Sequence, residues 1–363
     1  MSDPHKDPTR RCMPLAEWPA SDQLAWLDAS QVKPLLDDPG LAAHWRPQTK
    51  RWTVAAYGRF LTFLDLRGWL DPHLGPANRL SLERLRAYVE ELRGQVTPAT
   101  LAGRIRGLAE ALRVMTPGVE YPYLKRARYA LKARARPSRN KRARLVSTPE
   151  LLQLGLKLMQ RAEAATAARE VWQAGDHRDG LTIVLLAMRP IRLSNLAAMR
   201  IGQHLFKDGD DYHLAFDGEE TKNHRPYKLP LPAQLTPYID HYLAHYRPIL
   251  LGSRSDDHVW MSARHMPMGA GVLYGQIIKR TTDEFGRSVN PHLFRDAAVT
   301  MLGEEDPEKV WLSMTVLHQA DPRTADKHYN HARDGAAVRQ YQDVITAQRR
   351  AAAHPTRRRA VSR

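Results

Sequence analysis

Apolar residues recur every three or four positions from residue 49 to about 124, which is the spacing of an amphipathic helix. The first such stretch runs from Trp52 to Leu64, and Gly68 is a natural stop for it. Ser81 and Thr97 each precede another apolar-stepped stretch and are good helix-capping residues. The pattern therefore predicts a compact helical domain that contains no strands.

A second start signal, the capping-box sequence Ser147-Thr148-Pro149-Glu150, opens the second half of the chain. Within it, the apolar run LTIVLLAM at residues 181–188 predicts a buried helix. Between residues 204 and 232, the turn signals KDGDD and DGEE separate short apolar runs, and this predicts a small antiparallel sheet. From residue 233 to about 350 the pattern is helical again. The fold class is therefore expected to be mainly α, with a mostly α second domain that contains the sheet.

Residues 1–45 differ from the rest because they are rich in Pro and Asp, with scattered tryptophans. Trp18, Trp26 and Leu27 are candidate anchors for one short helix, but this composition gives little reason to expect a stable fold.

The positive charge of the chain is concentrated in two places. The net charge is +16; residues 125–144 hold ten Lys and Arg and no acid, and residues 346–363 hold six arginines and no acid. These sixteen charges equal the whole excess, so the rest of the chain is balanced. A basic linker and tail favour a nucleic-acid partner, since each neutralised phosphate releases counterions. The alternative is a solvated connector and a solubilising tail.

Length and cysteine content limit the class of protein further. A chain of 363 residues is expected to form two domains. No apolar run is long enough to span a bilayer, and the start MSDPHKDPTRR does not have the pattern of a signal peptide. Cys12 is the one cysteine, which excludes a disulfide framework and a cysteine-rich metal site. A reducing, cytoplasmic location is therefore expected, and the nucleic-acid partner favoured by the charge pattern makes it a nucleoid-associated one.

Three segments hold basic residues that could bind a phosphate. Arg192 lies just before a Ser-Asn capping pair, so its guanidinium is expected near a helix N-terminus, where anions bind well. Lys222 lies in the turn-flanked stretch EETKNHRPYKLPLP, and His292 and Arg295 are one helical step of three apart, on one face. Taken singly, each has an ordinary interpretation: a surface arginine, an exposed turn lysine and a structural pair.

A fourth segment, HQADPRTADKHYNHA at residues 318–332, gathers histidines around Tyr329. His328, His331 and Asp326 have the spacing of metal ligands. No second half of such a site is evident in the sequence, so no metal is expected there.

Together these segments resemble the tyrosine recombinase (phage integrase) family. IRLSNLAAMRI is similar to the family's first arginine box, and ETKNHRPYKLPL is similar to its β-hairpin lysine segment. PHLFRDAAVT resembles the His-x-x-Arg box, and VLHQADPRTADKHYNHA resembles the Leu-Gly-His to tyrosine segment. The four motifs occur in the family's order over about residues 150–345, and a four-part match is far more specific than any one box.

The resemblance implies a catalytic set, carried over by position: Arg192, Lys222, His292, Arg295, His318 and Tyr329. Arg192 and Arg295 would be the family's arginine pair, and Tyr329 would be the nucleophile. Arg189 lies in the same box, but the spacing to the following Ser and Leu favours Arg192.

The family's reaction is an in-line attack of a tyrosine oxygen on a DNA phosphodiester, which gives a 3′-phosphotyrosyl link and a free 5′-hydroxyl. Two arginines are planar, permanently charged donors for the non-bridging oxygens and can stand in for a metal ion. His292 would move the phenol proton or hold the phosphate, and His318 would add a donor. Lys222 would protonate the departing oxygen. No cofactor and no metal are therefore expected.

Two positions depart from the family's pattern. Asp296 directly follows Arg295, where many members carry a histidine. A helix neighbour points about 100° away, so Asp296 is expected to orient Arg295 or a nearby donor instead of touching the phosphate. A simple buried hydrogen bond is the alternative. Leu317 replaces the usual glycine before His318, which weakens that assignment.

The resemblance also implies a domain organisation. The helical domain would be a core-binding (SAM-like) domain, and it would clamp duplex DNA together with the catalytic domain. The expected ranges are 1–45 for an N-terminal extension, 46–130 for the core-binding domain, 131–147 for the basic linker, 148–345 for the catalytic domain and 346–363 for the basic tail. The N-terminal extension could bind an additional DNA site, contact a neighbouring subunit or lack fixed structure, and the last two are favoured. The expected contacts to the DNA backbone are Lys125, Arg126, Arg128, Lys132, Arg134, Arg136, Arg139, Lys141, Arg142 and Arg144.

The implied function is site-specific recombination of double-stranded DNA, as integration, excision or resolution in a mobile element. The family works as a homo-tetramer on two sites, and accessory DNA-bending proteins are possible partners. Three alternatives stay open: a type IB topoisomerase that relaxes DNA as a monomer, a non-catalytic DNA-binding protein, and a metal-dependent phosphodiesterase built on the histidines near Tyr329.

Overall fold

The computed structural model describes residues 7–33, 39–135, 142–164, 170–221 and 224–305. The chain divides into two compact units, residues 1–140 and 141–363. The described residues are mainly helical, with one small antiparallel sheet in the second unit, as the sequence predicts. Among the described helices, none combines the length and apolar character that a bilayer crossing requires.

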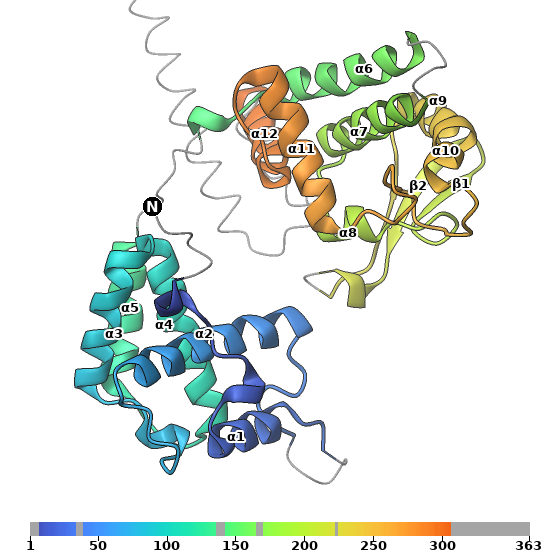
Figure 1. The fold of residues 1–363 in the computed structure, drawn as a ribbon. Coiled ribbons are helices and arrows are strands. Elements are labelled where there is room, and N and C mark those ends of the chain that lie inside the picture. Colours follow the sequence, from blue (N-terminus) through green and yellow to red (C-terminus); the bar gives the residue numbers. More distant parts are fainter. Residues whose placement is uncertain (1–6, 34–38, 136–141, 165–169, 222–223, 306–363) are drawn as a thin grey trace, which may run out of the picture. The chain divides into compact units, whose positions relative to one another are not determined.

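The described part of the first unit is helical throughout (Figure 1). Helix α2 packs against α4, and α4 also contacts α1 and α5. The elements are the 3₁₀ turns η1 (Pro8–Arg10), η2 (Leu15–Glu17) and η3 (Pro76–Asn78), and the helices α1 (Ala20–Ser30), α2 (Pro47–Leu66), α3 (Leu82–Gln95), α4 (Pro98–Met115) and α5 (Pro122–Arg134).

The helix starts expected in this unit are confirmed by their caps. The Ser81 hydroxyl accepts a hydrogen bond from the Arg84 amide (3.1 Å) at the start of α3, and Thr97 accepts one from the Thr100 amide (3.3 Å) at the start of α4. Gly68 follows α2 with a φ of 66°, a left-handed conformation that favours glycine.

The N-terminal residues belong to the core of the first unit. Met13, Trp18 and Trp26 are buried in the same cluster as the apolar face of α2, and Met13 donates a backbone hydrogen bond to the Gly58 carbonyl (3.1 Å). The expectation that Leu27 anchors the short helix is wrong, because its side chain is exposed on α1. The two tryptophans supply enough apolar surface to hold this Pro- and Asp-rich segment in place.

A fully buried ion pair links distant parts of this unit. Arg79 is 1% exposed and Asp22 is 0% exposed, and two guanidinium nitrogens of Arg79 bond both carboxylate oxygens of Asp22 at 2.6–2.9 Å. The Tyr57 hydroxyl donates to the same carboxylate (2.5 Å). Burial, and next the Asp22 charge, raise the pKa of Tyr57 far above its usual value, so the phenol stays protonated.

The second unit combines helices with the sheet. Its helical elements are η4 (Arg142–Arg144), α6 (Thr148–Ala164), α7 (Glu170–Met188), α8 (Leu193–Ala198), η6 (Gly218–Glu220), η7 (Ala233–Leu235), α9 (Thr236–His241), the π-helical turn η8 (Tyr242–Tyr246), α10 (Arg247–Leu251), α11 (Ala270–Phe285) and α12 (Pro291–Glu305). Its strands are β1 (Leu205–Asp208), β2 (Asp211–Phe216) and β3 (Tyr227–Pro230).

Helices α6 and α7 lie side by side and carry much of this unit's core (Figure 1). They approach closely at two glycines: a Cβ on Gly155 would lie 2.7 Å from the Gly180 carbonyl oxygen. The predicted capping box is confirmed at the start of α6, where the Ser147 amide donates to Glu150 (3.0 Å) and the Glu150 amide to Ser147 (3.4 Å). The predicted buried run 181–188 forms the end of α7.

The predicted sheet is confirmed, with antiparallel order β1-β2-β3. Leu205 pairs with Leu214, and Phe216 pairs with Tyr227. Alternate residues of β2 are buried, as expected for a sheet with one face against a core. The helical prediction after residue 233 is wrong for residues 252–269, which form turns and isolated bridges after Gly252 (φ 63°).

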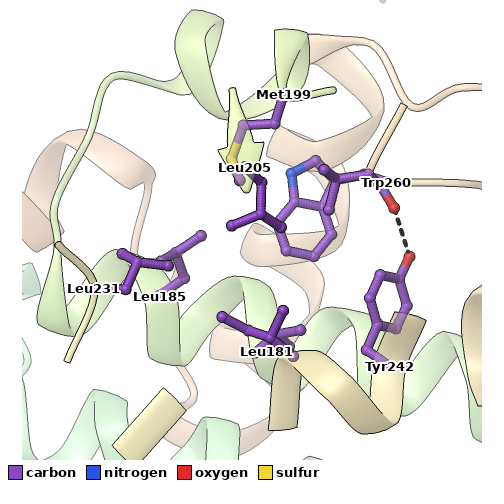
Figure 2. A pocket seen from close by; sticks show the side chains of 9 residues that line it. Leu181, Leu185, Met199, Leu205, Leu231, Tyr242 and Trp260 are labelled. Atoms are coloured by element: carbon purple, nitrogen blue, oxygen red, sulfur yellow. Dashed lines mark hydrogen bonds between the residues drawn. The ribbon is translucent and has the colours of Figure 1, made fainter. Parts of the chain in front are cut away.

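A small cavity lies inside the second unit, and Figure 2 shows its lining. Its volume is about 10 Å³. Side chains from α7, β1, α9, η8 and the turn that holds Val259 and Trp260 contribute to its largely apolar lining. The polar groups at its edge are used internally: the Tyr242 hydroxyl donates to the Val259 carbonyl (2.9 Å) and the Trp260 indole donates to the Leu196 carbonyl (2.9 Å). This cavity is therefore a packing defect of the core and has no room for a substrate.

Candidate functional site

Two arginines from distant segments come together in the second unit. Arg295 lies in the second turn of α12, is 7% exposed, and donates a hydrogen bond to the Pro190 carbonyl, 105 residues away in sequence. Pro190 lies in the short connection between α7 and α8, and Arg192 follows two residues later. This hydrogen bond ties α12 to the segment that carries Arg192.

The two guanidinium groups act on each other electrostatically. Burial, and next the repulsion from Arg192, lower the pKa of Arg295 to about 10, while Tyr227 and Asp296 oppose this change. Arg295 therefore keeps its charge at neutral pH, next to a second cation. Such a pair stabilises an anion that lies between or above the two groups.

The local structure around Arg192 differs from the prediction in one respect. Arg192 is itself the N-cap residue of α8, and the Ser-Asn pair expected to cap the helix lies inside its first turn. Helix α8 has six residues and is too short to offer a strong dipole. The guanidinium groups, and not the helix end, are therefore the groups of this segment that are suited to bind an anion.

Tyr227 is the residue that sequence reasoning missed. It opens β3 and pairs with Phe216, and the two ring centroids lie 5.3 Å apart with the ring planes tilted by 44°. Burial raises the pKa of Tyr227 to about 12, although the charges of Arg192 and Arg295 act in the opposite direction. The phenol thus lies within electrostatic reach of both arginines. It is part of the quoted motif RPYKLPL, but nothing in that pattern distinguishes it from an ordinary strand tyrosine.

Glu220 holds the loop between β2 and β3 in place through several hydrogen bonds. Its carboxylate accepts from the Asp217 amide (2.9 Å) and bonds His204 Nε2 (2.7 Å), and its backbone carbonyl accepts from Asn195 Nδ2 of α8 (3.5 Å). His204 Nδ1 accepts from the Arg200 amide (3.1 Å), so in the neutral ring the proton is on Nε2 and points at Glu220.

Hydrogen bonds of Thr221 also hold the chain on both sides of residues 222–223. Thr221 is fully buried, and its hydroxyl lies 2.9 Å from the Arg225 carbonyl and 3.1 Å from the Gly218 carbonyl. His224 has a φ of 54°, an uncommon backbone conformation for a residue with a Cβ. Lys222 itself lies outside the described residues.

Arg189, the alternative arginine of the first box, faces the sheet. Its guanidinium donates to the Pro230 carbonyl at the end of β3 (3.4 Å) and to the Met188 carbonyl (3.3 Å). It therefore supports β3, whereas Arg192 is the residue that interacts with Arg295.

His292 and Asp296 lie on α12 with Arg295. Asn290 caps this helix, since its side chain accepts from the amides of His292 (3.0 Å) and Leu293 (3.2 Å). His292 is exposed in the first turn, and Asp296 is half-buried. Asp296 raises the pKa of Arg295 by its charge, so the carboxylate is near enough to act on the guanidinium. His318 and Tyr329 lie outside the described residues.

The basic residues expected to bind DNA fall into three groups. Lys125, Arg126, Lys132 and Arg134 are exposed on α5. Arg128 pairs with Glu110 (3.2 Å), and Arg144 donates to the Ser288 carbonyl (2.6 Å) and hydroxyl (2.7 Å), so both have structural partners. Arg136, Arg139 and Lys141, and the side chain of Arg142, lie outside the described residues. The basic stretch thus begins within a regular helix.

No protein-family model matches the chain, and no curated protein matches it. Among solved structures, the chain is similar to the crystal structure of XerA recombinase, with 14% sequence identity over 84% of this chain and 94% of that chain. The TM-score of 0.39 is too low to support an inference about function.

Proposed function

We propose that this protein is a tyrosine site-specific recombinase, which breaks and rejoins double-stranded DNA through a 3′-phosphotyrosyl intermediate. The observation that carries the proposal is the pairing of Arg192 with Arg295 beside the anchored β2–β3 loop. The sequence places each of these elements in a motif that resembles the family. Two like charges held close together in a partly buried position favour the binding of an anion between them.

The two arginines would bind the non-bridging oxygens of the scissile phosphate, where negative charge grows in the transition state. Each planar guanidinium can bind two oxygens through two parallel N–H donors, a fixed bidentate geometry that a lysine ammonium does not offer. His292, exposed on the same helix, would hold the phosphate or move the phenol proton. Lys222 would protonate the 5′-oxygen as it leaves, and the ties of Thr221 and Glu220 would limit where the lysine segment can lie.

Tyr329 is the proposed nucleophile, and Tyr227 is the residue against which that assignment must be tested. A phenol near two arginines could also attack a phosphate that they bind. Burial holds the pKa of Tyr227 at about 12, which keeps its hydroxyl protonated at neutral pH and makes it a hydrogen-bond donor. We therefore assign Tyr227 a role in holding the phosphate, and Tyr329 the covalent step.

The test uses nicked suicide DNA substrates drawn from the sequence that flanks the gene, with products resolved on a denaturing gel. Wild type, Tyr329→Phe and Tyr227→Phe are compared, each with and without EDTA. A covalent protein–DNA band in wild type and Tyr227→Phe, but not in Tyr329→Phe, supports the proposal. Loss of the band in Tyr227→Phe alone would indicate that Tyr227 of β3 is the nucleophile.

The same experiment separates the alternatives. EDTA-sensitive cleavage that persists in both tyrosine variants would indicate a metal-dependent phosphodiesterase. Relaxation of arbitrary supercoiled plasmids without strand exchange would indicate a type IB topoisomerase. Binding in a gel shift, without a covalent band on any flanking DNA, would indicate a DNA-binding protein without catalysis.

The proposal extends to the assembly. By resemblance, a homo-tetramer would join two recombination sites, with accessory bending proteins as possible partners. The mass of the complex on a two-site DNA, measured by light scattering, tests this directly. A complex that contains one protein chain per site and still exchanges strands would contradict it.

A further inference from the structure

A second cluster of ionisable side chains lies beside the first half of α7, away from Met188, where the arginine segment begins. Glu163 near the end of α6, His177 of α7 and His241 at the end of α9 each offer one ligand atom, and these atoms all lie within 4.8 Å of one another. His241 Nδ1 is already 3.6 Å from Glu163 Oε1. Three separate elements thus converge on one point.

His177 is the residue that requires an explanation. It is 0% exposed, and neither of its ring nitrogens has a hydrogen-bond partner in the described structure. Buried polar atoms without partners are rare, and an ion or a water commonly accounts for them.

We propose that Glu163, His177 and His241 bind a divalent transition-metal ion, with Zn²⁺ as the best fit. Two imidazoles and a carboxylate are a ligand set that zinc accepts at about 2.0–2.2 Å, with the ligand atoms roughly 3.4 Å apart in a tetrahedron. The Glu163–His241 distance already matches this spacing. Glu163 is exposed and its side chain can rotate to close the remaining gap.

The surroundings favour a cation at this point. The π-helical turn η8 follows His241 directly, and such turns are frequent at functional sites. His245 of that turn lies 4.8 Å from His241 between ring centroids, so it or a water can take the fourth position. The nearby Asp176 is bonded to Arg161 and Arg280, which leaves Glu163 as the carboxylate of the site.

Aromatic packing alone is the competing explanation for His177. Its ring stacks on Tyr246 (4.5 Å between centroids, 29° between planes) and lies near Tyr242 (6.1 Å). A phenylalanine at position 177 would satisfy that packing equally well but has no ligand atoms. His177→Phe therefore separates the two explanations.

The bound ion would tie the end of α6 to α7 and η8, as a structural centre separate from the arginine pair. The experiment uses the full chain, stripped with a chelator and desalted. Zn²⁺ affinity and stoichiometry are measured by competition with a chromophoric chelator, Co²⁺ coordination by visible absorption, and the unfolding temperature with and without Zn²⁺. The variants are Glu163→Gln, His241→Gln and His177→Phe, and the matched control is His73→Gln, an exposed histidine of the first unit.

Wild type and His73→Gln are expected to bind one more tight equivalent of Zn²⁺ than His241→Gln and His177→Phe, and only they should gain thermal stability from the ion. Glu163→Gln is expected to bind at least about tenfold more weakly, since loss of even an outer partner of a metal ligand costs about 10–100-fold in affinity. Equal stoichiometry, affinity and thermal shift in all five proteins would overturn the proposal and leave adventitious binding by other histidines.

Discussion

Arg295 donates a hydrogen bond to the carbonyl oxygen of Pro190, two residues before Arg192. This hydrogen bond links the His-x-x-Arg helix to the first arginine box. It also helps to orient the planar guanidinium of Arg295. The fold brings the two arginines into mutual electrostatic range through this connection and not through any local sequence feature.

Arg295→Lys should lower single-turnover DNA cleavage by about 100- to 1000-fold, the range seen when one transition-state donor is removed. Lysine keeps the charge but has neither the planar fork nor the reach to bond Pro190 and a phosphate at once. The covalent product on a nicked substrate measures the rate. Arg264→Lys, an exposed arginine of the same unit, is the control and should cleave normally. Equal cleavage rates in both variants would show that Arg295 is not part of the catalytic site.

The parts of the fold that were predictable from the sequence are those set by neighbouring residues. The caps at Ser81, Thr97 and Ser147, and the turns around β2, depend on contacts a few residues long. The pairing of Arg192 with Arg295 was predicted from the family resemblance. The hydrophobic periodicity of the sequence could not have predicted it. Neither source indicated that Arg189 would bond Pro230 or that Tyr227 would lie beside both arginines.

The remaining differences have physical causes. The composition of residues 1–45 gives little reason to expect a stable fold, yet Trp18 and Trp26 bury large apolar surfaces in the core of the first unit, where Trp18 contacts Tyr57 of α2. Leu27 is adjacent to Trp26 on α1 and therefore points to a different face. The cluster of Glu163, His177 and His241 could not be predicted from the sequence, because its members are separated by 14 and 64 residues. They come together only when α6, α7 and α9 pack.

Asp296→Asn should lower cleavage by about 10- to 100-fold without changing the fold, since partners that orient a functional group are commonly worth that much. The carboxylate supports the positive charge of Arg295, and the amide has the same shape but no charge. Asp283→Asn removes an exposed carboxylate that pairs with Lys279 on α11 and serves as the control. Wild-type rates in Asp296→Asn would leave Asp296 with a structural hydrogen bond only.

Glu220 should make stability depend on pH in the acid range. Burial alone would raise the pKa of Glu220, but the Asp217 amide and His204 together lower it. A carboxylate whose pKa is depressed by folding contributes stability that is fully present above its unfolded pKa of about 4.3, and that is lost as pH falls through the folded value. The unfolding free energies of wild type and Glu220→Gln should differ at pH 7, and this difference should shrink as pH falls below the unfolded pKa of about 4.3 toward the lower folded pKa. A difference that stays constant down to pH 3 would contradict this assignment.

Asp22→Asn should destabilise the first unit severely. The change leaves the Arg79 guanidinium buried without its counter-charge, and such a change costs about 3–5 kcal/mol. Glu90→Gln breaks the exposed pair with Arg93 and should cost less than about 1 kcal/mol. Chemical denaturation, followed by tryptophan fluorescence, measures both. Similar midpoints for the two variants would show that Arg79 has relaxed into contact with water.

The exposed basic face of α5 should determine how strongly DNA binding depends on salt. Replacement of its exposed cations by alanine should reduce the slope of log K against log salt by about 0.9 for each DNA phosphate that the protein then fails to neutralise. The residues to change are Lys125, Arg126, Lys132 and Arg134.

The matched control removes the same charge from exposed arginines on α2, α3 and α4 of the same unit: Arg51, Arg86, Arg93 and Arg113. Because its net charge falls equally, it separates binding by α5 from the general attraction of a basic protein to a polyanion. Fluorescence anisotropy with duplex DNA at several salt concentrations gives both slopes. If α5 lies on the DNA backbone, its variant should have the shallower slope by about 3 to 4 units, whereas equal slopes would mean that the attraction is not localised there.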